Sequence, residues 1–343
     1  MNLTEFIHAL PKAELHLHLE GAVAAPTVIE LARRHGIDIP DFGGGSDLYD
    51  FKDLAAFLKV YDIVCRCMRT PEDFHRATYE TLARCAASNV RYVEMFFSPW
   101  AHRTCGITYS AMLDGILAGM RAAERDLRVI ARLIPAHNRE LGPQAGREFL
   151  DEVLADRREQ VIGIGLDYLE AGHPPAAYAG VWHAARAAGL RVTAHAGESG
   201  PARNIRDSIE KLSCDRIDHG YHIVDDAGLL DDCRNSRIGF TVCPSTTRYT
   251  TIWRDLDDPA HPIRRMAAAG LQISLNTDDP GFFWTDLDGE YRIAAEHLQF
   301  SPRQLADSAL TALRTSWLDP HTSREWLSAW GAEIDALLGQ LDT

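Results

Sequence analysis

The sequence lacks a long apolar run and an excess of positive charge, and both absences narrow the class of protein. No segment holds enough consecutive apolar residues to cross a bilayer, and residues 1–7 contain no basic region followed by an apolar one. The formal net charge is −14 and the pI is about 5.5, so nucleic acid and anionic membranes would repel the chain. We expect a cytoplasmic protein whose partner is a small molecule.

Organised cysteines and a nucleotide-binding glycine motif are also missing. The seven cysteines are scattered, and only Cys65 and Cys67 lie close together. This pattern forms neither a disulfide framework nor a thiolate zinc site, which favours a reducing compartment. No Gly-x-Gly-x-x-Gly turn follows any early strand, so the usual signature of a nucleotide-binding open sheet is absent.

The 343 residues have an ordinary globular composition, with 46% hydrophobic and 24% charged residues. Apolar, β-branched runs alternate with alanine-rich helical stretches along most of the chain. Counting the opening stretch 12–21, the pattern predicts eight strands, the others at 90–98, 127–136, 161–166, 190–195, 216–219, 238–243 and 271–277. Helices are predicted at 109–125, 144–156, 175–188, 225–234 and 262–269, and the tail 301–343 is expected to pack outside as helix.

Apolar strands separated by helices imply a parallel sheet buried on both faces. Eight such units predict an α/β fold of the (β/α)₈ TIM-barrel type, with its active site at the carboxyl ends of the strands. An open doubly wound sheet is the alternative. Extra helices at 25–35, 53–68 and 71–88, with a glycine loop at 43–45, exceed what one crossover needs. We therefore expect a single domain, 1–343, with a helical lid at about 22–89.

Polar residues gather at the predicted carboxyl ends of the strands. His16 and His18 would share one strand face, because side chains alternate with a period of two. His195 ends the fifth strand, His219 the sixth, and Asp278 with Asp279 follows the eighth. Read singly, each histidine could be a buried structural residue, and Glu198 could be a helix N-terminal glutamate stabilised by the dipole.

Taken together, three histidines and one carboxylate make a nitrogen and oxygen donor set for zinc with a position left for water. Zinc lowers the pKa of such a water to roughly 7. Two adjacent carboxylates after an apolar strand would be costly to bury without a cation or donor nearby. The fourth strand, 161–167, offers no lysine to bridge two metals, which favours one zinc ion per subunit.

Four motifs in order, 12–21, 195–198, 218–220 and 274–280, resemble the adenosine and adenine deaminase family of zinc-dependent barrel enzymes. The resemblance covers nearly the whole chain. It implies that the zinc ligands are His16, His18, His195 and Asp278. It further implies that Glu198 donates a proton to the purine ring, that His219 orients the attacking hydroxide, and that Asp279 hydrogen-bonds the ring nitrogen on the imidazole side.

Further segments, 93–99 and 163–175, look most like the bacterial branch that acts on free adenine, and Glu20 stands where nucleoside-specific members commonly carry an Asp. Tyr168 and the run 243–247, Cys-Pro-Ser-Thr-Thr, depart from the family pattern and bear on specificity. The resemblance implies hydrolytic deamination of a 6-aminopurine, adenine or a modified adenine base. The alternatives are an adenosine-type nucleoside deaminase, a zinc hydrolase of amides or esters, and a barrel that binds a purine or metal without turnover.

Overall fold

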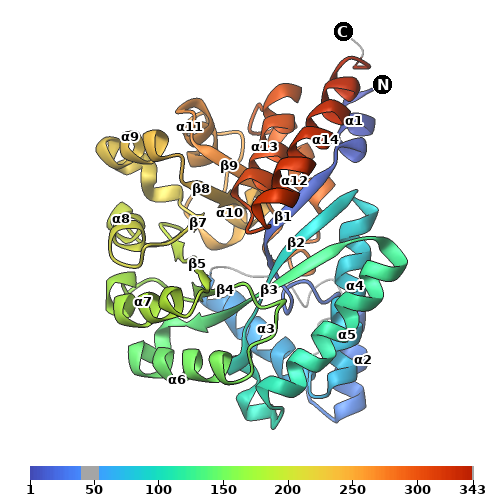
Figure 1. Cartoon of the computed structure of the whole chain (residues 1–343), viewed down its shortest axis with the longest axis vertical. Helices are drawn as coiled ribbons and strands as arrows, with labels where there is room; N and C mark the ends of the chain where they lie inside the picture. The colour runs from blue at the N-terminus through green and yellow to red at the C-terminus, as the bar shows by residue number, and fades with distance from the viewer. Residues whose placement is uncertain (40–53, 342–343) are drawn as a thin grey trace.

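The computed structural model describes residues 1–39 and 54–341. The predicted glycine loop 43–45 and the predicted helix start at Asp53 lie outside these residues. Nine strand segments run through the centre of the molecule, and helices surround them (Figure 1). The strands are β1 Lys12–His18, β2 Val90–Phe97, β3 Ile130–Asn138, β4 Gly163–Asp167, β5 Arg191–Val192, β6 His195–Ala196, β7 Arg216–His219, β8 Gly239–Val242 and β9 Gln272–Leu275.

All paired strands are parallel, in the orders β1-β2-β3-β4-β5 and β6-β7-β8-β9. β5 and β6 are two pieces of one fifth strand. Between them, the Thr193 amide still bonds the Ile164 carbonyl at 3.1 Å, whereas the Thr193 carbonyl accepts from the Trp182 indole instead. The side-chain donor therefore interrupts the ladder without breaking the strand order.

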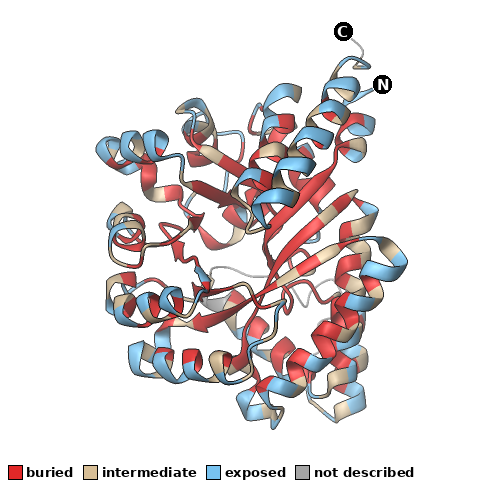
Figure 2. Ribbon diagram, in the orientation of Figure 1, coloured by how far each residue is buried: buried red, intermediate tan, exposed pale blue. Residues whose placement is uncertain are grey.

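The eighth strand closes the sheet against the first. The His18 amide bonds the Asp278 carbonyl at 2.8 Å, and the Asp278 amide bonds the His16 carbonyl at 2.9 Å. The predicted eight-stranded barrel is confirmed. The strands are almost wholly buried, while the surrounding helices bury one face and expose the other (Figure 2).

Helices follow the strands as the alternating pattern predicts, but several end a few residues from the expected positions. Segment 175–188 is a 3-10 turn, Pro175–Tyr178, followed by a helix, and short helices after the fifth, seventh and eighth strands were not predicted. The helices are α1 Leu3–Ala9, α2 Ala25–His35, α3 Leu54–Cys67, α4 Pro71–Ala87, α5 Tyr109–Leu127, α6 Gly142–Ala155, α7 Ala179–Ala187, α8 Ala202–Glu210, α9 Ala227–Ser236, α10 Pro244–Thr250, α11 Pro262–Ala268, α12 Leu287–Glu296, α13 Pro302–Thr315 and α14 Pro320–Leu338.

The extra helices between the first two strands are present as α2, α3 and α4. Capping explains α4, because the Thr70 hydroxyl accepts from the Asp73 amide while the Asp73 carboxylate accepts from the Thr70 amide. α4 packs along α5 outside the barrel, whereas α3 lies over the carboxyl ends of the strands, where Leu54, Phe57 and Tyr61 line a cavity. Among the described residues, no helix is long and apolar enough to span a membrane.

Candidate active site

Three histidines and one aspartate converge at the carboxyl end of the barrel. The Nε2 atoms of His18 and His195 lie 3.1 Å apart, and Asp278 Oδ1 lies 3.1 Å from His16 Nε2 and 3.4 Å from His18 Nε2. All four residues are buried. Lone pairs held this close repel one another unless a cation lies among them. The donor set of three imidazole nitrogens and one carboxylate oxygen fits zinc.

A buried aspartate, Asp218, lies behind two of these rings. Asp218 lies 3.8 Å from His16 Nδ1 and 3.6 Å from His195 Nδ1, and the Thr241 hydroxyl bridges it to His16 through contacts of 2.9 Å. The Thr241 hydroxyl and Asp218 together hold the His16 ring with Nε2 facing inward, as is usual for metal-binding histidines, whereas His195 Nδ1 has no hydrogen-bond partner among the described residues. Asp218 thus supports the site without entering it.

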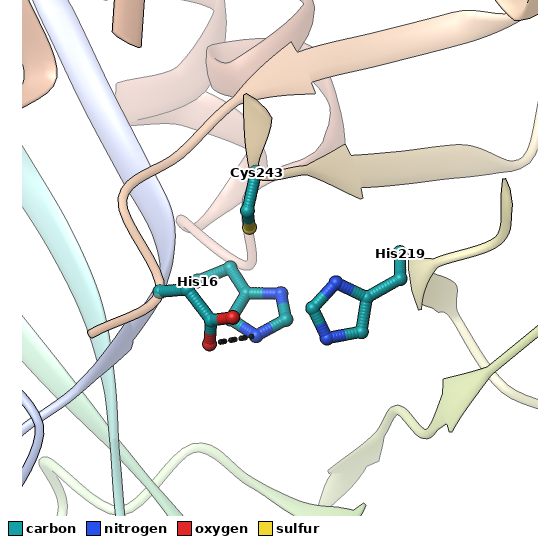
Figure 3. A group of neighbouring side chains, drawn as sticks. His16, His219 and Cys243 are labelled. Atoms are coloured by element: carbon teal, nitrogen blue, oxygen red, sulfur yellow. Dashed lines mark ion pairs between the residues drawn. The ribbon is translucent and has the colours of Figure 1, made fainter. Parts of the chain in front are cut away.

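Cys243 and His219 also lie close to His16. Figure 3 shows the Cys243 side chain directed from the end of β8 toward the two rings, and the ring centroids of His16 and His219 are 4.6 Å apart. Figure 3 also marks the ion pair that His16 makes with Asp278. His219 Nδ1 contacts the Tyr221 hydroxyl at 3.3 Å and its Nε2 faces Glu198 at 3.8 Å. His219 therefore lies next to Glu198, and together with His16, Cys243 and Asp278 it also forms a second group of donors close enough to hold a metal ion.

Glu198 is a carboxyl group with an unusual environment. It is buried, and burial together with the nearby charge of Asp278 raises the pKa of Glu198 to about 8. The Thr250 hydroxyl donates to its Oε1 at 2.6 Å. A carboxylic acid that keeps its proton at neutral pH can act as a proton donor.

The loop that carries Glu198 is held by a second buried carboxylate. Glu170 accepts hydrogen bonds from the four consecutive amides of residues 197–200, at 2.9 to 3.1 Å, and from the Asn204 side chain at 2.7 Å. The buried guanidinium of Arg139 lies 3.9 Å from Glu170 and also donates to the His195 carbonyl. This arrangement fixes the backbone from His195 to Glu198.

Asp279 follows Asp278 and lines the same cavity. Burial and the adjacent Asp278 charge raise the pKa of Asp279 well above its usual range. A Cβ at Gly21 would lie 1.6 Å from Asp279 Oδ1, and only glycine leaves that space. Glycine at position 21 in the opening motif therefore admits the Asp279 side chain.

Of the two remaining predicted substrate-binding residues, Tyr168 lines the cavity and Glu20 does not. Tyr168 lines the cavity, and its hydroxyl donates to Asp62 of α3 at 3.3 Å. Glu20 is fully buried and accepts from the Tyr61 hydroxyl, the Ser98 amide and His102 Nε2 at 2.9 to 3.0 Å. Glu20 does not line the cavity itself but hydrogen-bonds Tyr61, which does.

Sequence reasoning missed the role of α10. Thr246 and Thr250 lie one turn apart and so share a helix face. The Thr246 hydroxyl donates to Asp278 Oδ2 at 2.9 Å, and the Thr250 hydroxyl donates to Glu198. The departure Cys-Pro-Ser-Thr-Thr therefore retains a hydroxyl on the aspartate ligand. The spacing of the two threonines was a visible signal, but α10 itself was not predicted.

The barrel, the four convergent donors and the adjacent acid define a class of metal-dependent barrel hydrolases. The sequence profile described as adenosine deaminase matches residues 11–331, and the chain belongs to this family. Proteins named adenine deaminase from Vibrio parahaemolyticus and Rhodospirillum rubrum are each 36% identical to it, over 92% and 93% of this chain and 94% and 96% of theirs.

Two solved structures are similar over nearly the whole chain. Adenine deaminase from Arthrobacter aurescens has a TM-score of 0.90 and 32% identity, covering 96% of this chain and 99% of that one. An amidohydrolase from Burkholderia ambifaria, solved with bound zinc, has a TM-score of 0.92 and 37% identity, covering 98% and 93%. Metal dependence in this family thus accords with the donor set described above.

Proposed function

We propose that this protein is a zinc-dependent aminohydrolase that replaces the exocyclic amine of a 6-aminopurine and releases ammonia, with adenine as the first substrate. One observation carries the proposal: the protonated Glu198 carboxyl lies beside four convergent metal donors at the wall of a cavity. The relatives named adenine deaminase support the choice of a free base.

In this proposal His16, His18, His195 and Asp278 hold one zinc ion. Bound there, zinc acidifies a water molecule so that it can attack at neutral pH. Glu198 gives its proton to the ring nitrogen beside the attacked carbon, which avoids an anionic adduct. His219, next to Glu198, orients the attacking oxygen.

Asp279 and Tyr168 bind the purine directly in this proposal. Asp279 hydrogen-bonds the ring nitrogen on the imidazole side. Tyr168 closes the side of the cavity next to α3, and Glu20 acts through the Tyr61 hydroxyl that it accepts from. A nucleoside such as adenosine is the second candidate substrate, because the family includes enzymes that act on it.

We further propose that the chain is one domain and that α3, within the lid predicted at about 22–89, is the helix that covers the cavity. α3 contributes Leu54, Phe57, Leu58 and Tyr61 to the cavity wall. Its aromatic side chains pack on those that follow the eighth strand, since Phe57 stacks on Phe283 with centroids 5.5 Å apart. Entry of a substrate would require these contacts to open.

The test is ammonia release from a panel of adenine, N6-substituted adenines, adenosine and pterins, with metal analysis of the same protein. We expect about one zinc per chain, turnover of adenine, and a loss of roughly 10²- to 10⁴-fold in kcat for Glu198→Gln with zinc retained. Zinc binding without any turnover would favour a non-catalytic barrel. Ammonia release that Glu198→Gln leaves unchanged would refute the assigned acid.

A further inference from the structure

Two cavity-lining aspartates each leave a buried carboxyl oxygen without a protein partner among the described residues. They are Asp279 Oδ1 and Asp167 Oδ1, on side chains that are 3% exposed. A buried oxygen without a donor is costly, so such a group at a cavity wall indicates a ligand. Asp279 already has a proposed role, but Asp167 has none.

The two aspartates lie on opposite walls. Asp167 ends β4, the fourth strand of the barrel, whereas Asp279 follows β9, the eighth. In a closed barrel of eight strands the fourth and eighth stand across from each other. A flat ligand between them would therefore meet one carboxyl on each side.

The carboxyl groups of Asp279 and Asp167 have different hydrogen-bond environments. Asp279 Oδ1 has no hydrogen-bond partner among the described residues. Asp167 accepts from the Ser98 hydroxyl at 3.5 Å through Oδ2, and burial raises its pKa to about 7 despite the nearby Arg139 guanidinium. Each wall therefore presents one unpaired carboxyl oxygen to a ligand, and Asp167 Oδ1 can accept a hydrogen bond from it.

A free purine base matches this pair. Its five-membered ring has one nitrogen with a lone pair and one N–H, and these point in nearly opposite directions in the ring plane. A nucleoside carries its sugar in place of that N–H. It would leave Asp167 Oδ1 unpaired and would press the sugar toward Tyr168 and α3.

We propose that Asp167 accepts the imidazole N–H of a free purine base and is the residue that selects bases over nucleosides. The inference rests on the proposed function, since it takes the purine as ligand. It adds the specificity contact on the wall opposite Asp279. Tyr61 and Ser98, whose hydroxyls lie 3.0 Å apart, connect Asp167 to the buried Glu20 and hold its second oxygen in place.

Binding of purine and 9-methylpurine to the zinc-loaded protein, measured by calorimetry, tests this contact separately from catalysis, because neither compound carries an amine to lose. We expect the unsubstituted protein to bind purine about tenfold to a hundredfold more tightly, the range for a hydrogen bond to a charged group. In Asp167→Ala the two affinities should agree within about threefold, with Asp167→Asn between. Asp207→Asn, a buried aspartate on α8 outside the cavity, is the matched control and should keep the original ratio.

Equal losses for both compounds in Asp167→Ala would mean a structural role and would overturn the proposal. So would an unchanged ratio. The proposal would also be overturned if Asp167→Ala changed the affinity ratio of purine to 3-deazapurine but left the ratio of purine to 9-methylpurine unchanged. That result would place the Asp167 contact on the six-membered ring. Ammonia release from adenine is scored separately: if it is absent while the purine ratio behaves as expected, the proposed reaction fails and the Asp167 contact stands.

Discussion

Glu198 shows how one residue depends on its surroundings for its protonation state. Water would leave a glutamate ionised at neutral pH, but here burial and the Asp278 charge raise the pKa to about 8. The same burial lowers the pKa of the neighbouring His219 to about 3, so that ring is neutral. The pair therefore presents one proton donor and one uncharged ring to the substrate.

This assignment predicts a pH dependence. A general acid works only while protonated, so kcat/KM should hold up to about pH 8 and then fall about tenfold per pH unit. Steady-state ammonia release between pH 6 and 10 measures it. The residual activity of Glu198→Gln should lack this decline. A rate that is flat to pH 10 in the unsubstituted protein would contradict the role of Glu198.

At the scale of elements, α10 contacts both Glu198 and Asp278 through threonine hydroxyls. Thr250→Val removes a hydroxyl from Glu198, and we expect kcat to fall roughly fivefold to tenfold, as for one lost hydrogen bond. Because that hydrogen bond lowers the pKa of Glu198, its loss should move the alkaline decline to higher pH. The pH profile of kcat/KM measures both effects.

Thr250→Ser should restore both properties, since it keeps the hydroxyl. Thr251→Val is the control, because the Thr251 hydroxyl bonds the Thr247 carbonyl of the same helix and does not reach the site. Equal losses in the two valine variants would show that α10 was merely destabilised.

The lid is the second element with a testable consequence. If α3 closes over bound ligand, amide hydrogen exchange in Leu54–Cys67 should slow when a transition-state analogue binds. Exchange in α13, which packs on the barrel away from the cavity, serves as the internal reference. Unchanged exchange in α3 would mean that it is a fixed wall.

Strand order and the convergence of the candidate ligands could be predicted from the sequence because both follow local periodicity. The apolar runs predicted eight strands. Polar residues at the ends of three of these runs, His195, His219 and Asp278, were predicted to lie at the site. The partners of those residues could not be predicted, because they depend on how distant elements pack. Nothing in residues 244–250 shows that Thr246 will meet Asp278, and nothing near Glu170 shows that it will cap the loop of Glu198.

At the scale of the whole molecule, the proposed metal site lies where the first and last strands of the barrel meet. β1 and the segment after β9 meet through His16, His18 and Asp278, whose side chains are also proposed metal ligands. Metal binding should therefore stabilise the fold. A metal at about 1,000 times its Kd adds about 4 kcal/mol to the free energy of unfolding.

Removing the metal with a chelator should lower the melting temperature by about 5–10 °C, given a few degrees per kcal/mol for a chain of this size. Differential scanning calorimetry before and after chelation measures it, and added zinc should restore the original value. His8→Ala, at a solvent-exposed histidine outside the site, should show the same shift as the unsubstituted protein. A melting temperature that chelation and zinc leave unchanged would argue against metal at the seam.

Three residues at the cavity wall, Tyr168, His219 and Asp278, have positive backbone φ angles of 67°, 66° and 62°. Residues other than glycine rarely adopt this backbone conformation, and each one that does reduces the stability of the fold by of order 1 kcal/mol or more. Selection for heat resistance alone would favour glycine at Tyr168 and His219, whereas Asp278 would be retained because the proposed metal binding stabilises the fold by more than its strain costs. Selection for turnover would retain all three side chains. Variants selected separately for stability and for activity should therefore diverge first at positions 168 and 219.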